Sequence, residues 1–173
     1  ANIYFPDSGR VYSQGRLAAS LELGSGFLLE FTGLENLYLH GAIFGLSRAR
    51  ILRKIDQIVE FCGLKDFLDV PMRQYSSGMR LRLAFAFMVN IEPDILLIDE
   101  SLAVGDLAFR QKCFAKIEEL KRRGTTFILV SHNLDEIERL SDRLIFLDKG
   151  KIKTIGPVKD VLGQYKESYA HRY

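Results

Sequence analysis

The chain has 173 residues, which predicts about one domain; 47% of them are hydrophobic and 27% are charged. This composition is typical of a folded globular protein and excludes a disordered tail, a collagen-like repeat and a disulfide-rich mini-protein. With 24 basic and 22 acidic side chains the formal net charge is +2, so no overall charge favours binding to nucleic acid or to a membrane surface.

Cysteine spacing and the absence of targeting patterns indicate a cytoplasmic protein. Cys62 and Cys113 form no CxxC pair, so we expect two buried thiols and neither a zinc site nor a disulfide framework. No apolar run approaches the roughly 18 to 20 residues of a membrane span, and the first residues lack the pattern of a secretory signal. The chain begins with Ala1 and a Pro-Asp-Ser-Gly turn after what is typical of a helix end, so we expect a fragment.

Helical and strand periods alternate along the chain, which predicts an α/β fold with a largely parallel sheet. Thr32 and Glu35 form a capping box that predicts a helix over about 33–44. Ser47 caps a second predicted helix, 47–62, which stops at a glycine. Its apolar stripe, expected to pack on the core, consists of Ile51, Ile55, Ile58, Val59 and Cys62.

The middle of the chain predicts a strand, a helix and a second strand after a buried helix. Residues 78–90 have helix-forming side chains and are apolar nearly all round. Residues 94–99 and 126–130 are continuously apolar, which is typical of central parallel strands covered on both faces. Residues 107–123 lie between them and predict a helix with a basic end.

The last third predicts a short helix, a hairpin and a terminal helix. Asn133 and Glu136 have the spacing of another capping box. A turn joins the predicted strands 143–147 and 151–155, and an amphipathic helix follows Pro157.

Two adjacent carboxylates, Asp99 and Glu100, follow the first apolar strand. Open α/β sheets bind their ligands at the carboxyl ends of their strands. In a nucleotide hydrolase the first carboxylate can hold Mg²⁺ through water, and the second can accept a proton from the attacking water. The alternative is a pair of helix-capping acids on a loop.

Two further segments carry groups suited to phosphate. His132 follows the second apolar strand, where it would face the same crevice and could bond a terminal phosphate or the attacking water; a structural histidine is the alternative. The segment YSSGM, residues 75–79, precedes the buried helix and would present free backbone N–H groups to an anion. An ordinary serine cap is the alternative there.

The order and spacing of YSSGM, DILLIDE, AVGD and VSH resemble the ATP-binding subunit of ABC transporters. The resemblance implies a P-loop NTPase-like, mostly parallel sheet, with a helical subdomain at about 33–75 and a core at about 76–173. It implies ATPase activity with ATP and Mg²⁺. It assigns ATP contacts to the signature loop (Tyr75, Ser76, Ser77, Gly78 and Met79) and to Asp106 of the D-loop, Mg²⁺ binding to Asp99, and catalysis to Glu100 and the switch histidine His132.

The segment at 21–48 further resembles the branch that exports polysaccharide, O-antigen or teichoic acid. Most transport ATPases carry a glutamine about nine residues before the position of Thr32. Here that register falls near Leu23, and the adjacent Glu22 is the candidate Mg²⁺ ligand in its place.

No GxxxxGK[ST] loop occurs in the 173 residues, so the expected fold lacks the P-loop strand and helix. We expect that these residues alone neither bind nor hydrolyse ATP appreciably. Truncation upstream of Ala1 and natural loss of the loop both remain open explanations.

The resemblance implies a homodimer in which each signature loop acts on the nucleotide of the partner copy. It also implies a polytopic membrane permease as partner, a peripheral position at the cytoplasmic face of the plasma membrane, and contact with glycan only through a separate domain. Two other readings are an ABC-type ATPase that handles nucleic acid and a non-catalytic relative without a P-loop. Nucleic-acid binding is not expected, because this chain has no long coiled-coil insertion and few basic residues near the signature.

Overall fold

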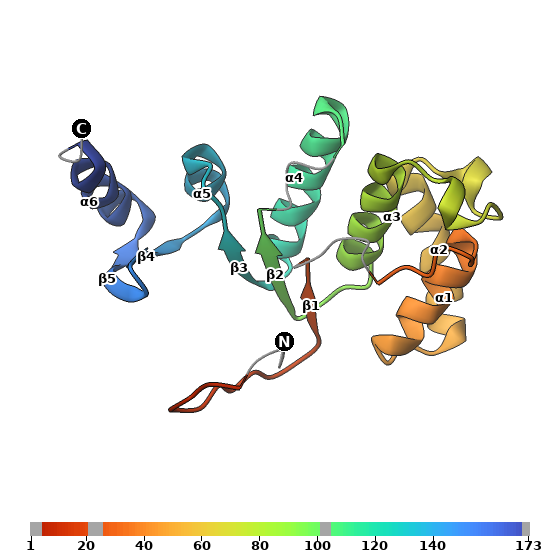
Figure 1. Cartoon of the computed structure of the whole chain (residues 1–173), viewed down its shortest axis with the longest axis horizontal. Coiled ribbons are helices and arrows are strands. Elements are labelled where there is room, and N and C mark those ends of the chain that lie inside the picture. Colours follow the sequence, from red (N-terminus) through yellow and green to blue (C-terminus); the bar gives the residue numbers. More distant parts are fainter. Residues whose placement is uncertain (1–4, 21–25, 101–104, 171–173) are drawn as a thin grey trace. The chain divides into compact units, whose positions relative to one another are not determined.

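The computed structural model describes residues 5–20, 26–100 and 105–170, with side chains up to residue 168. The chain forms two compact units, residues 1–128 and 129–173, which are described separately. The elements, labelled in Figure 1, are β1 (Leu17–Ala19), α1 (Gly33–Ile43), α2 (Arg48–Cys62), η1 (Lys65–Phe67), η2 (Met72–Gln74), α3 (Ser77–Asn90), β2 (Ile95–Asp99), α4 (Leu107–Arg122), β3 (Thr126–Val130), α5 (Leu134–Leu140), β4 (Arg143–Asp148), β5 (Lys151–Pro157) and α6 (Val158–Ala170).

A three-stranded sheet in the order β1-β2-β3 supports the first unit. β1 and β2 are parallel, with Leu17 opposite Ile95 and Ala19 opposite Leu97. The Thr126 N–H donates to the Asp94 carbonyl at 2.9 Å, which joins the start of β3 to the start of β2. The predicted α/β class with a parallel sheet is therefore confirmed. The three residues of β1 were not predicted.

Local caps set the ends of the two helices that follow β1. The Thr32 hydroxyl accepts from the Glu35 N–H at 3.1 Å, and the Glu35 carboxylate accepts from the Thr32 N–H at 2.8 Å, so the predicted capping box is confirmed. Ser47 caps α2, which ends at Gly63 with a left-handed φ of 70°. Every residue of the predicted apolar stripe of α2 is buried.

Helices α1, α2 and α3 lie side by side in the first unit (Figure 1). Helices α1 and α2 pack tightly at Gly41, where an added Cβ would lie 2.1 Å from Cδ1 of the buried Ile51. Only glycine lets the two helices meet at this distance, because any side chain would displace Ile51.

The core of the first unit is built around α3, whose residues Leu83–Asn90 are all buried, as predicted. Phe61 of α2, Phe85 of α3 and Phe109 of α4 form an aromatic cluster with ring centroids 5.6 to 6.3 Å apart. Cys62 and Cys113 are buried free thiols, in agreement with the sequence. The aromatic cluster therefore joins three helices that are far apart in sequence.

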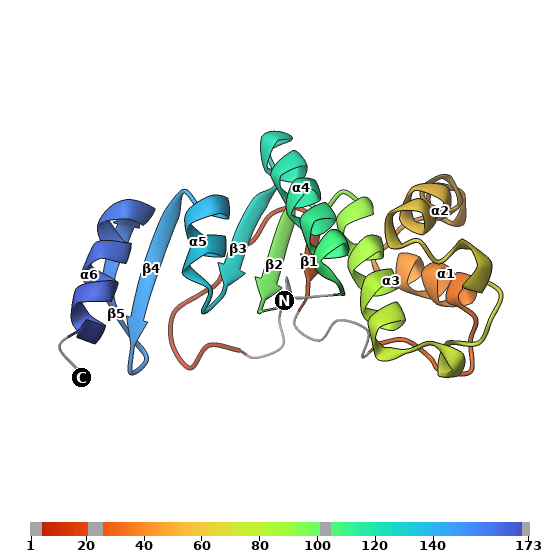
Figure 2. The same cartoon turned by 90° about the horizontal axis from the view of Figure 1, so that it is seen from above.

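The second unit is a hairpin covered by helices. β4 and β5 pair antiparallel, with a bulge between Phe146 and Leu147, and α6 packs against both strands (Figure 2). Ile137, Val158 and Leu162 form its core. At α5, Asn133 caps the helix as expected, but its own N–H donates to the Ser131 hydroxyl rather than completing a capping box with Glu136.

The expectation that both apolar runs form strands covered on two faces is wrong for β3. Thr126, Ile128 and Val130 are exposed, and Ile128 and Val130 are each 56% exposed. Successive side chains of a strand point to opposite faces. Among the described residues, other side chains cover only one face of β3.

Phe85→Ala should destabilise the first unit strongly. The Phe85 side chain is fully buried between Phe61 and Phe109, so its loss removes transfer free energy and leaves a cavity. We expect the free energy of unfolding to fall by about 3 to 5 kcal/mol in urea titrations. Leu52→Ala on α2, where the side chain is 59% exposed, is the control and should change it by less than about 1 kcal/mol. Equal losses in the two variants would contradict the burial of Phe85 in the aromatic cluster.

Candidate functional site

The two predicted carboxylates lie at the end of β2, in the first unit. Leu96 and Ile98 are buried, whereas Asp99 and Glu100 are exposed. Glu100 is not a glycine and yet has a φ of 47°, in the left-handed region. Such backbone conformations are costly and cluster at functional sites. The strand therefore ends in two solvent-facing acids, the second held in an unfavourable conformation.

Ser20, directly after β1, holds the backbone at this strand end. Its hydroxyl accepts from the Asp99 N–H at 3.2 Å, and its own N–H donates to the Leu97 carbonyl at 2.9 Å. Ser20 is almost fully buried. The sequence did not single out Ser20, because one serine after a three-residue strand has no distinctive pattern. Glu22, the candidate glutamine replacement two residues later, lies outside the described residues.

The donor set at Asp99 suits Mg²⁺ rather than a metal enclosed by protein ligands. Among the described residues no group of three or more His, Cys, Asp or Glu side chains could hold a metal ion. Mg²⁺ usually keeps several waters and binds one or two carboxylates together with phosphate oxygens. A single exposed carboxylate at a strand end fits that requirement. Mg²⁺ binding by Asp99 stays a prediction.

The predicted signature loop leads into the N-terminus of α3. The Ser76 hydroxyl accepts from the Met79 N–H at 3.1 Å and thereby caps the helix. Ser76 and Ser77 are exposed. Among the described residues, a Cβ added at Gly78 would meet only the Ser76 hydroxyl, at 3.8 Å, so packing against them does not require glycine. The open space in front of Gly78 would let a ligand approach the backbone closely.

Tyr75, the first residue of the loop, is buried and holds the loop to the helices before it. Its hydroxyl donates to the Phe67 carbonyl, and its ring meets that of Phe67 edge to face at 6.3 Å. Burial raises the pKa of Tyr75 to about 12. Its side chain therefore has a structural role in this conformation, and the predicted contact of Tyr75 with ATP remains untested.

Asp106 begins α4 and uses both of its carboxylate oxygens within the chain. One oxygen accepts from the Phe109 N–H at 2.9 Å and caps the helix; the other accepts from the Arg82 guanidinium at 2.8 Å. The bond from Phe109 and the bond from Arg82 hold the pKa of Asp106 below its usual value. Arg82 was not among the predicted site residues. Its ion pair has no sequence signal, since 24 positions separate the two side chains.

His132 belongs to the second unit and is exposed between β3 and α5. The Ser131 hydroxyl beside it accepts from the Asn133 N–H at 3.0 Å and donates to the Glu136 carboxylate at 2.9 Å, so the backbone around His132 is held locally. His132 therefore belongs to a different compact unit from Asp99 and Glu100. Their convergence around one nucleotide stays a prediction.

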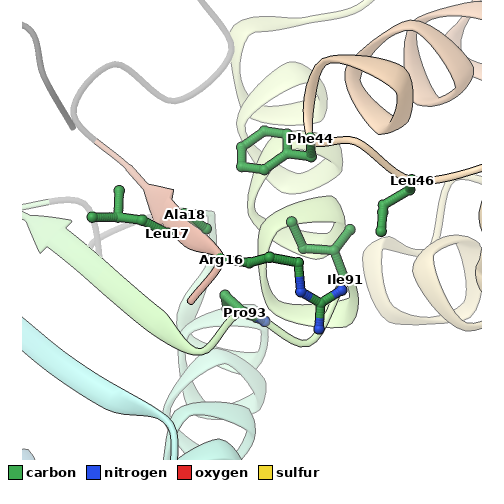
Figure 3. A pocket seen from close by; sticks show the side chains of 7 residues that line it. All are labelled: Arg16, Leu17, Ala18, Phe44, Leu46, Ile91 and Pro93. Atoms are coloured by element: carbon green, nitrogen blue, oxygen red, sulfur yellow. The ribbon is translucent and has the colours of Figure 1, made fainter. Parts of the chain in front are cut away.

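Two cavities in the first unit contain none of the predicted site residues. The smaller, of about 10 Å³, lies beside β1, and Figure 3 shows the Arg16 guanidinium among apolar side chains that include Phe44, Leu46 and Ile91. This volume suits a single water at most. The larger, of about 320 Å³, is lined by residues of α2 and α4 and by Asn90 and Glu92. Neither cavity is lined by Asp99 or Glu100 at the end of β2.

Comparison with known proteins identifies the family to which this fold belongs. The family model described as "ABC transporter" matches residues 6–103. This chain belongs to the ABC transporter family.

Its relatives include ATP-binding proteins of polymer export systems. The O-antigen export system ATP-binding protein RfbB of Klebsiella pneumoniae is 42% identical over 98% of this chain, and the alignment covers 69% of that protein. The ABC transporter protein AbcA of Aeromonas salmonicida is 45% identical over 92% of the chain and 52% of its own length. The teichoic acids export ATP-binding protein TagH of Bacillus cereus is 38% identical over 96% of the chain and 30% of its own length.

Solved structures share the fold. An ATP-binding subunit of an ABC transporter superimposes with a TM-score of 0.77 at 25% identity, over 87% of this chain and 62% of that one. A dimeric ATP-binding cassette in a post-hydrolysis state, bound to ADP and Pi, gives a TM-score of 0.67 at 19% identity, over 83% and 63% of the two chains. The expected class, an ABC ATPase fold, is confirmed. None of the described helices is long and apolar enough to cross a bilayer.

The buried phenol of Tyr75 should make stability fall at high pH. Because its folded pKa is about 12 and its ordinary value is 10.0, its contribution is fully present below pH 10 and is lost as pH rises toward 12. We expect the free energy of unfolding of Tyr75→Phe to be lower than that of the wild type near pH 8, by about 1 kcal/mol for the lost hydrogen bond. The difference in the free energy of unfolding between the wild type and Tyr75→Phe should narrow between pH 10 and 11.5. Denaturant titrations across this range test this, with Tyr12→Phe, which removes an exposed hydroxyl, as control. A constant difference between wild type and Tyr75→Phe would contradict the burial of this phenol.

Proposed function

We propose that this chain is the ATP-binding and ATP-hydrolysing part of an ABC exporter for a cell-surface polysaccharide, such as an O-antigen or a teichoic acid. The observation that carries the proposal is the end of β2, where Asp99 and the strained Glu100 reach solvent together from a buried parallel strand. The export-system names of its relatives in Klebsiella pneumoniae and Bacillus cereus support the substrate class.

Each of the chain's own groups has a proposed task. Asp99 would hold Mg²⁺ through water, and the Glu100 carboxylate accepts a proton from the attacking water. His132 donates a hydrogen bond to the terminal phosphate or orients the water. Ser76, Ser77 and Gly78 offer hydroxyl and backbone N–H groups to phosphate at the N-terminus of α3, where the helix dipole favours negative charge. When bound, Mg²⁺ would neutralise charge that develops on the phosphate oxygens.

The partners follow from the same proposal. A second copy of the chain supplies its signature loop to the nucleotide held by the first. A polytopic permease takes up the motion at the cytoplasmic face of the plasma membrane. The dimeric state of the cassette bound to ADP and Pi supports the pairing by fold alone. The export-system names of the relatives support a membrane partner.

Glu100→Gln should abolish most ATP turnover while leaving ATP binding intact. Glutamine keeps the shape of the side chain but cannot accept the proton, and a general base usually contributes about 10² to 10⁴ in rate. The measurement is steady-state phosphate release, with nucleotide affinity measured in parallel, in the protein expressed from its complete gene. Glu138→Gln, an exposed position on α5, is the matched control and should leave turnover unchanged. Near-normal turnover in Glu100→Gln would remove Glu100 from this role.

The 173-residue chain by itself should show no ATP affinity in the micromolar range. It contains no GxxxxGK[ST] loop, whose backbone amides and lysine normally hold the phosphates. Calorimetric titration of the purified chain with MgATP tests this expectation. Micromolar binding would indicate that the end of β2 and the N-terminus of α3 are enough to bind the nucleotide without a P-loop.

A further inference from the structure

One arginine joins the starts of two helices in the first unit. Arg82 of α3 donates from Nη2 to Oδ2 of Asp106, the N-cap of α4, at 2.8 Å. The same guanidinium lies 5.0 Å from the ring centroid of Phe109, in the first turn of α4. Arg82 therefore contacts α4 through a charge and through an aromatic face, two interactions that the planar guanidinium makes at once.

The turn before α4 is shaped to receive this guanidinium. Gly105 has a left-handed φ of 75°, and a Cβ there would lie 3.3 Å from Nε of Arg82 and 3.1 Å from Cδ1 of Phe109. Glycine suits both the backbone conformation and the narrow space. The second oxygen of Asp106 accepts from the Phe109 N–H, so the carboxylate cannot turn away from Arg82 without uncapping the helix.

The other side of the connection is the signature loop. Arg82 lies five residues after Ser77, where α3 begins, or about 8 Å along the helix axis. Arg80 donates to the Tyr75 carbonyl at 2.8 Å, and Ser76 caps the helix. The loop is thus fixed to the first turns of α3, and those turns are fixed to Asp106.

We propose that Arg82 is a positioning residue that keeps the N-terminus of α4 in register with the signature loop at the N-terminus of α3. The N-termini of α3 and α4 then contact the nucleotide as one rigid unit, and a movement of either helix end moves the other. The inference rests on the proposed ATPase function. Arg82 itself does not touch the nucleotide.

The Arg82–Asp106 ion pair should contribute little to the stability of the fold. The side chains of Arg82 and Asp106 are 30% and 64% exposed. Ion pairs this exposed contribute little to the free energy of folding. The catalytic constant of the enzyme, rather than its stability, is therefore the quantity that should respond to loss of this contact.

Two single variants and their combination test the inference in the protein expressed from its complete gene. Arg82→Met removes the charge and keeps an apolar stem on Phe109. Asp106→Ser keeps a capping hydroxyl and removes the oxygen that Arg82 contacts. We expect each to lower kcat for ATP by about tenfold, with KM within about twofold and Tm within a few degrees of the wild type. The double variant should be no slower than Asp106→Ser alone, because that change already removes the contact with Arg82 together with the ATP contact expected of Asp106.

Lys116→Met is the control, because it removes a different ion pair on the same helix, Lys116 to Glu119 at 3.2 Å. It should leave kcat unchanged. Unchanged kcat in Arg82→Met, or losses that multiply in the double variant, would overturn the positioning role while the wild type still hydrolyses ATP. A wild-type protein that hydrolyses no ATP would overturn the proposed function and this inference together.

Discussion

Burial of α3 is the constraint on which the rest of the first unit depends. Residues Leu83–Asn90 are enclosed on all sides, with α2 and α4 packed against the helix. Such a helix cannot rotate about its axis without breaking the core on every side, because protein interiors are close-packed. The direction in which its N-terminal N–H groups point is thus set by packing at the opposite end. Ser76 and Ser77 are exposed to solvent, and the packing of α3 fixes the direction in which they point.

The backbone at the end of β2 is likewise fixed by its buried neighbours. Pairing with β1 and the bond from the Asp99 N–H to Ser20 hold the backbone up to Asp99. The chain must then leave the sheet sharply, and Glu100 takes a left-handed conformation to do so. Strain at that residue persists because buried neighbours hold the strand before it. Preorganised acids and preorganised amides are what phosphoryl transfer requires of a protein, since positioning and electrostatics supply most of its catalysis.

Local chemistry explains why most elements could be predicted from the sequence. The Thr32 and Glu35 box and the glycine at position 63 set helix ends through atoms only a few residues apart, and α1 and α2 begin and end within a residue of expectation. β1 was missed because three residues are too few to show a period. The exposed face of β3 was not predicted, because an apolar run shows that a strand can be buried but not whether other elements pack against both of its faces.

The sequence by itself determined the class of the fold, the order of its elements and the chemical groups at the two strand ends and at the start of α3. These depend on periodicity, capping and motif spacing, all of which are written in neighbouring residues. Only the tertiary structure decided that Tyr75 is buried against Phe67, that Ser20 holds Asp99, and that Arg82 of α3 reaches Asp106 at the start of α4. The contacts of Ser20 and Arg82 join residues 79 and 24 positions apart, and the Tyr75 contact joins the ends of two short helical turns. Whether such residues meet depends on how the elements pack, which no local pattern encodes.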